Sequence, residues 1–121
     1  MHDDDQEIRI LLIGDIVGKT GRRIVKQTLP GLRESLGLDL VIANAENSAA
    51  GSGITPKIFS ELRAAGVDLM TLGDHAWKRK DNLVVLNEEE YCLRPSNYPE
   101  VAAGKGWGVV TTDSGVQVAH I

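Results

Sequence analysis

The chain has few of the residues on which disulfide-rich, membrane-bound and aromatic-rich proteins depend. It contains one cysteine, Cys92, in 121 residues, which excludes an internal disulfide framework and suits a reducing compartment. Aromatic residues make up only 4% of the chain, so we expect a core of Leu, Ile, Val and Ala. No apolar run approaches the roughly 20 residues that a membrane span requires. We therefore expect one small cytoplasmic domain that does not interact with membranes.

An excess of basic residues is also missing. The formal net charge is −4, which argues against stable nucleic-acid binding, because a phosphate backbone requires a basic face. A small anionic substrate stays compatible with this charge if metal ions supply the positive charge. The first residues, MHDDDQE, lack the basic-then-apolar pattern of a secretion signal. We expect residues 1–7 to form a disordered acidic leader and residues 8–121 to belong to a single domain.

Three apolar segments predict strands of a mostly parallel sheet. Residues 8–13 (IRILLI) show almost no alternation of apolar and polar side chains, which is typical of a strand buried on both faces. The other two segments, 38–47 (LDLVIANAEN) and 67–75 (VDLMTLGDH), each run from apolar into polar residues. Helical patterns lie between the strands, and this order is typical of an α/β fold.

The expected helices differ in how clearly their ends are marked. The first has an apolar face that ends at Gly37, and Pro30 should kink it or divide it in two. The second covers 55–66, with a Thr cap, a Pro at its first position and a closing Gly, and the third covers 78–90. Residues 106–121 alternate around Asp113-Ser114-Gly115 and predict a C-terminal β-hairpin.

Each predicted strand ends in a cluster of polar residues. The clusters are Gly14-Asp15, Asn44-Ala45-Glu46-Asn47 and Gly73-Asp74-His75. Ligands gather beyond the carboxyl ends of parallel strands, and neighbouring strands lie about 5 Å apart, so these clusters can share one small volume. Asp15, Glu46 and Asp74 would repel one another there unless a cation neutralised them. Oxygen ligands beside a His suit a divalent ion such as Mn, Fe or Mg.

Each cluster also has a purely structural interpretation. Asp15 alone can be a turn or helix-cap residue, and the segment 44–47 can be a hydrogen-bonded loop. Asp74 and His75 can form an Asx turn followed by a partly buried His. Three such clusters at three successive strand ends are together hard to explain as loops and favour a site.

The glycine-rich segment GDIVGKTGRR, at residues 14–23, raises a third alternative, a phosphate-binding P-loop. That loop requires four residues between its first Gly and the Gly-Lys-Ser/Thr motif, but only three residues separate Gly14 from Gly18. Asp15 would also repel the phosphates. We interpret Arg22 and Arg23 as residues of a solvated surface, although they can help to hold an anion.

Four segments together resemble the YmdB-like family of calcineurin-type metallophosphoesterases. They are LLIGDIVGKTGR, ANAENSAAGSGIT, LGDHAWKRK and LRPSNYPE, and the resemblance runs from about Ile8 to the end of the chain. It implies a four-layered α/β/β/α sandwich, of which this chain would be the N-terminal half. It also implies a phosphodiesterase that uses two divalent metal ions (Fe, Mn or Mg) to hydrolyse 2′,3′- or 3′,5′-cyclic nucleotides.

The resemblance assigns a role to each candidate residue. Asp15 matches a ligand of the first metal, Glu46 the carboxylate that bridges both ions, and Asn47 a further ligand. Asp74 stands where the family usually has an Asn ligand of the second metal, which should shift the metal preference or the rate. His75 matches the His that donates a proton to the leaving oxygen.

The family also draws three His ligands from a second half that this sequence does not contain. We do not expect His2 or His120 to replace them. The sequence ends at Ile121 within an apolar segment, which favours a fragment with little or no activity alone. A non-catalytic, metal-binding fragment is therefore the main alternative, and self-association into a homo-oligomer stays open.

Overall fold

The computed structural model describes residues 6–74 and 80–121. Within these residues, β1 to β4 form a parallel sheet in the order β1-β2-β3-β4, and β5 and β6 form an antiparallel hairpin. The elements, in chain order, are β1 (Ile10–Ile13), α1 (Gly18–Leu36), β2 (Leu40–Asn44), α2 (Pro56–Ala65), β3 (Leu69–Thr71), α3 (Lys80–Glu88), β4 (Cys92–Leu93), β5 (Gly108–Thr111) and β6 (Gln117–His120).

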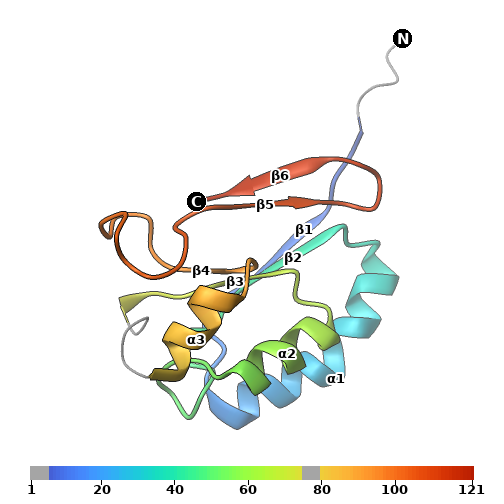
Figure 1. Cartoon of the computed structure of the whole chain (residues 1–121). Helices are drawn as coiled ribbons and strands as arrows, with labels where there is room; N and C mark the ends of the chain where they lie inside the picture. Colours follow the sequence, from blue (N-terminus) through green and yellow to red (C-terminus); the bar gives the residue numbers. More distant parts are fainter. Residues whose placement is uncertain (1–5, 75–79) are drawn as a thin grey trace.

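The helices lie on one face of the parallel sheet and the hairpin lies on the other (Figure 1). This arrangement confirms the predicted α/β class, with a mostly parallel sheet and a C-terminal hairpin. The four-layered sandwich stays a prediction. Among the helices in the described ranges, none has the length and apolar character that a bilayer crossing requires.

The apolar core occupies both faces of the parallel sheet. On the helical face, Val41 and Met70 pack with buried residues of α1 and α2, such as Leu29 and Leu62. On the other face, side chains of β2, β3 and β4 pack against the hairpin. The sheet contributes Leu40, Ile42, Leu69 and Leu93, and the hairpin contributes Val110 of β5 and Val118 of β6. β2 is buried at four of its five positions, as its apolar run predicted.

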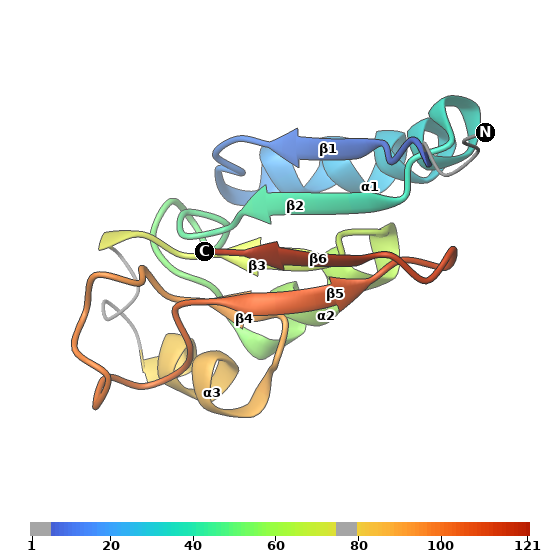
Figure 2. The ribbon, with the colours of Figure 1, turned by 90° about the horizontal axis from the view of Figure 1, so that it is seen from above.

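β1 differs from the prediction that it is buried on both faces. Leu12 is 70% exposed and Ile10 is 43% exposed. β1 is the edge strand of the sheet, and the hairpin lies over β3 and β4 without covering β1 (Figure 2). An apolar run therefore marks a strand correctly here but does not tell which of its faces another layer covers.

The helix ends follow from local sequence. Thr55 Oγ1 accepts a hydrogen bond from Ile58 N at 3.2 Å, and α2 ends at Gly66, which has a φ of 117°. α1 likewise ends at Gly37, with a φ of 59°. The predicted division of α1 at Pro30 is wrong, because α1 continues through it. Pro30 lies on the exposed side of α1, where the peptide carbonyl that loses its partner can bond to water.

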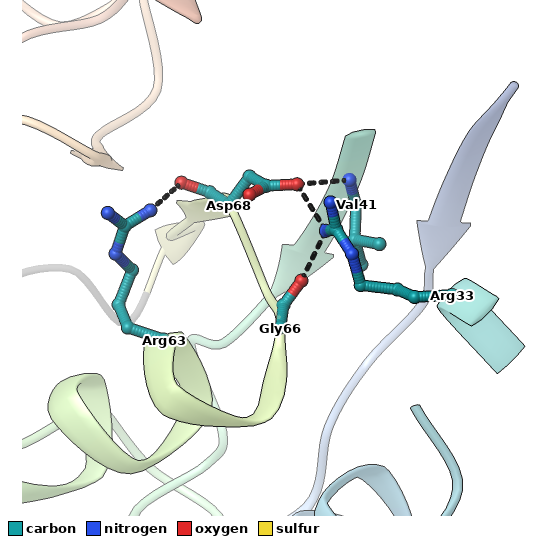
Figure 3. Close-up of polar contacts among 5 residues, drawn as sticks. All are labelled: Arg33, Val41, Arg63, Gly66 and Asp68. Carbon is teal, nitrogen blue, oxygen red and sulfur yellow. Dashed lines mark hydrogen bonds and ion pairs between the residues drawn. The ribbon is translucent and has the colours of Figure 1, made fainter. Parts of the chain in front are cut away.

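Asp68 joins both large helices to the entrances of two central strands (Figure 3). Its Oδ2 accepts hydrogen bonds from Arg33 Nη1 at 2.6 Å and from Val41 N at 2.8 Å. Arg33 Nη1 also donates to Gly66 O at 2.7 Å, and Arg63 Nη1 donates to Asp68 O at 2.6 Å. The network therefore fixes α1 and α2 relative to β2 and β3.

Replacing Asp68 by Ala should lower the free energy of unfolding by about 1.5–3 kcal/mol, the range for hydrogen bonds to charged groups. The variant leaves Arg33 and the Val41 N–H without their carboxylate acceptor. Lys26→Ala is the control, because it removes the more exposed ion pair with Glu61, at 3.3 Å, and should cost less than about 1 kcal/mol. Urea denaturation measures both. Equal losses of unfolding free energy in the two variants would show that the Asp68 network stabilises the fold no more than an exposed ion pair does.

Burial also determines the chemistry of the single thiol. Desolvation, followed by the nearby Glu89 carboxylate, raises the pKa of Cys92 from 9.0 to about 12. The thiolate therefore forms more easily in the unfolded state than in the folded state. Below pH 9 the thiol is neutral in both states and the folded protein keeps its full stability. As pH rises from 9 toward 12, ionisation of the unfolded thiol lowers the free energy of unfolding by up to about 1.4 kcal/mol per pH unit. Cys92→Val should lack this part of the alkaline loss in denaturation curves; identical pH profiles would contradict the assignment.

Candidate functional site

The first three strands end at one edge of the sheet. β1 pairs with β2 through Ile13 and Ala43, and β2 pairs with β3 through Asn44 and Thr71. The pairing extends beyond the strands, because Ile16 N donates to Asn44 O at 3.2 Å and Ala45 N donates to Thr71 O at 2.9 Å. The polar residues that follow these strands are therefore held in neighbouring backbone segments.

Asp15 and Asn47 meet directly at this edge. Asn47 Nδ2 donates to both carboxylate oxygens of Asp15, each at 3.0 Å. The two backbones are joined nearby, since Gly18 N donates to Asn47 O at 3.0 Å. Asp15 is exposed and Asn47 is half-buried. The carboxylate thus keeps lone pairs that can reach a ligand from solvent.

Glu46 lies against the end of β3. A Cβ atom added to Gly73 would meet both carboxylate oxygens of Glu46 more closely than real Cβ contacts allow. Asn44 Nδ2 donates to Glu46 Oε1 at 3.4 Å, and Gly53 N donates to Glu46 O. The glycine at position 73 therefore leaves the space in which the Glu46 carboxylate lies over the backbone of the third segment.

Asp74 and His75 complete the predicted set. Asp74 directly follows Gly73 and its side chain is exposed. Within residues 6–74 and 80–121, no hydrogen bond joins Asp74 to Asp15, Glu46 or Asn47. His75 lies outside the described residues, so its predicted role stays a prediction.

The described polar groups at this edge are carboxylates and amides and do not form a cluster of acidic side chains. Among the described residues, no three His, Cys, Asp or Glu side chains are grouped closely enough to hold a metal ion. The edge instead combines carboxylates with amides, and Asn44 Oδ1 is a buried acceptor to which none of these residues donates. A buried oxygen of this kind is a suitable ligand for a hard cation. Sequence reasoning did not assign Asn44, although it ends the strand that precedes Glu46.

Arg22 supports the loop that carries Glu46 and Asn47. The expectation that it belongs to a solvated surface is wrong, since Arg22 is half-buried and its Nη1 donates to Ser48 O. Ser48 is buried, and its Oγ donates to Ala45 O at 2.7 Å. α1 is thereby linked to the loop immediately after the candidate ligands. Arg23 is exposed, as expected.

The structure also disfavours the P-loop alternative. A P-loop binds phosphate through free backbone N–H groups. Here Gly18 N donates to Asn47 O at 3.0 Å, and Gly21 N donates to Val17 O at 3.1 Å. These two donors therefore bond within the protein.

One family model and several known proteins match the chain. The model of the family described as YmdB-like protein matches residues 11–121. A 2′,3′-cyclic-nucleotide 2′-phosphodiesterase of Bacillus subtilis (strain 168) is 40% identical over 82% of the chain and 38% of its own length. A putative phosphatase/phosphodiesterase of Mycoplasma genitalium is 38% identical over 74% of the chain and 32% of its own length. The chain thus spans less than two fifths of these curated relatives.

Two crystal structures share the fold. A hypothetical protein from Thermus thermophilus superposes with a TM-score of 0.85 at 42% identity, over 93% of this chain and 43% of that chain. A protein described as a novel phosphatase, from Mycoplasma pneumoniae, gives a TM-score of 0.79 at 36% identity, over 87% of this chain and 39% of that chain.

Replacing Gly73 by Ala tests whether the position of Glu46 matters for metal binding. The added methyl group must displace the Glu46 carboxylate, so Mn²⁺ affinity should fall by about 10–100-fold, as for other supporting residues of metal sites. Gly14→Ala is the matched control, because nothing lies within 4 Å of the added Cβ there. Titration calorimetry measures both affinities. Equal Mn²⁺ binding by the two variants would separate Glu46 from the metal site.

Proposed function

Because the chain belongs to the YmdB-like family, we propose that it supplies part of the active site of a metal-dependent phosphodiesterase that hydrolyses cyclic nucleotides. The observation that carries this proposal is the convergence of Asp15 with Asn47, and of Glu46 with Gly73, at the carboxyl edge of three parallel strands. The names of the curated relatives support a phosphoric ester hydrolase.

Asp15, Glu46, Asn47 and Asp74 are the proposed ligands of two divalent ions, Mn, Fe or Mg. Glu46 has two carboxylate oxygens and could therefore contribute to holding both ions, while Asn47 is positioned by its contact with Asp15. Asn44 Oδ1 is an additional acceptor next to Glu46. Divalent ions, when bound, polarise a phosphoryl group and lower the pKa of a coordinated water to near neutrality.

His75 is the proposed proton donor to the leaving oxygen. It directly follows Asp74, a proposed metal ligand, in the sequence. General acids of this kind contribute about 10²–10⁴-fold to the rate. Removal of His75 should therefore affect turnover much more than metal content.

The loop 47–53 favours a small cyclic phosphodiester as the substrate. After Asn47 and Ser48 it contains only Ala, Gly and Ser, and Ala50 and Gly51 both have positive φ, at 52° and 82°. Small side chains in a tight loop leave space beside the proposed metal ligands. The Bacillus subtilis relative, named for 2′,3′-cyclic nucleotides, makes this class the first to test, with 3′,5′-cyclic nucleotides second.

The alternative is a chain that binds metal and does not catalyse. It is favoured by length, because the chain spans 38% of the Bacillus subtilis relative, and the family resemblance implies further His ligands. We expect the 121-residue chain to bind Mn²⁺ weakly and to hydrolyse bis-p-nitrophenyl phosphate little or not at all. Rapid hydrolysis by this chain would show that no further ligands are required.

In a polypeptide that carries this chain at the length of its relatives, three variants separate the proposed roles. His75→Ala should abolish turnover of 2′,3′-cyclic nucleotides and leave the Mn²⁺ content unchanged. Asp15→Ala should remove both the turnover and the bound Mn²⁺, because a proposed metal ligand is lost. Glu34→Gln, at the far end of α1, changes the charge equally and should alter neither. Mass spectrometry of bound metal and a product assay provide the two measurements.

Metal loss in His75→Ala would show that His75 is a ligand and not a proton donor. Unchanged metal content and turnover in Asp15→Ala would refute the proposed site.

A further inference from the structure

Arg94 is a buried cation that the proposed reaction does not use. It directly follows β4 and is only 7% exposed. Its Nη1 donates to Pro95 O at 3.0 Å, but its Nε is buried and finds no acceptor among the described residues. The ion pairs of the part of the chain that the structure describes do not include Arg94. Within that part, no carboxylate lies within ion-pair distance of Arg94, although Glu100 and Arg94 line a second cavity together.

An arrangement of this kind is unfavourable unless an anion approaches the guanidinium. Burying a charge costs several kcal/mol, and natural proteins compensate by pairing it. An Arg side chain cannot escape this cost by losing its proton, because a guanidinium stays protonated in proteins. A buried Arg without an ion-pair partner among the described residues is therefore a candidate to bind an anion.

Arg94 is one of the residues that line a cavity of about 330 Å³ at the carboxyl ends of β3 and β4. The polar side chains around this cavity are those of Thr71, Arg94, Ser96, Asn97 and His120. Neither Asp nor Glu is present among the described lining residues, which also include Ile121, the last residue of the sequence. All five side chains can donate hydrogen bonds, so the cavity is suited to an oxyanion.

One wall of this cavity is next in the chain to the candidate site, and another wall lies close to Arg94. Leu72, which lines the cavity, immediately precedes the Gly73 that contacts Glu46. Gly106, on the other wall, would place an added Cβ 3.2 Å from Arg94 Nη1. The cavity is therefore lined by a residue next in the chain to the segment that contacts Glu46, and Gly106 lies close to the Arg94 guanidinium.

We propose that this cavity is a phosphate-binding subsite in which Arg94 holds phosphate oxygens, with Ser96 and His120 as further donors. The choice of phosphate over another oxyanion rests on the proposed function, because the neighbouring strand ends are assigned to a phosphodiester. The planar guanidinium matches two phosphate oxygens at once. The subsite itself requires no metal.

Titration of metal-free protein with inorganic phosphate in the presence of EDTA tests the subsite apart from the metal centre. Arg94→Gln should weaken phosphate binding by about tenfold or more, because a charge-assisted hydrogen bond is lost. Ser96→Ala, at an exposed position, should weaken it by a smaller factor and keep the fold. Arg23→Gln, an equal loss of charge at an exposed position on α1, should bind as the parent does.

A second measurement does not depend on the folding of any variant. In ¹H–¹⁵N spectra of the parent, the Arg94 Nε–H resonance should shift on phosphate addition and saturate with the calorimetric affinity. Asp15→Ala should bind phosphate normally under these conditions, so failure of the metal proposal leaves this test intact. A parent without saturable phosphate binding, an unmoved Arg94 signal, or equal affinities of Arg94→Gln and Arg23→Gln would overturn the subsite.

Discussion

The parallel register of β1, β2 and β3 is the constraint on which the candidate site depends. It places the ends of three strands side by side, so that residues far apart in sequence become neighbours. Asp15 reaches Asn47 across 32 positions, and Gly73 receives the Glu46 carboxylate. At the opposite end of the sheet, Asp68 bonds to Val41 and to Arg33 and Arg63 of the two large helices. The site thus has a rigid support built from backbone pairing at one end and from an ionic network at the other.

Charge is distributed unevenly along the functional edge. Carboxylate and amide oxygens gather after β1, β2 and β3, whereas a buried guanidinium lies after β4. A phosphate ester held by cations at the first region would also be attracted to Arg94 at the second. Arg22 contributes in another way, because it bonds to Ser48 O and so holds the loop that carries Glu46 and Asn47. The overall charge of −4 is therefore a poor guide to local preference for anions.

Features encoded by neighbouring residues were predictable from sequence. The apolar run of β2, the Thr55 cap and Gly66 stop of α2, and the hairpin turn all appear in the structure as expected. Features that depend on distant partners were not. β4 has only two residues and exists through its pairing with β3, and the exposure of β1 follows from where the hairpin lies. Nothing in the sequence distinguishes Asn44 and Arg94 from other polar residues. Each has a buried polar atom without a hydrogen-bond partner among the described residues, and this is seen only in the folded chain.

The central claim is that oxygen ligands from separate strand ends meet around divalent cations. X-ray diffraction from crystals grown with Mn²⁺, recorded on both sides of the manganese absorption edge, tests it most directly. The account predicts anomalous density between Asp15 and Glu46, within about 2.0–2.5 Å of their carboxylate oxygens. Anomalous density elsewhere on the surface, or none at this edge in a protein saturated with Mn²⁺, would contradict it.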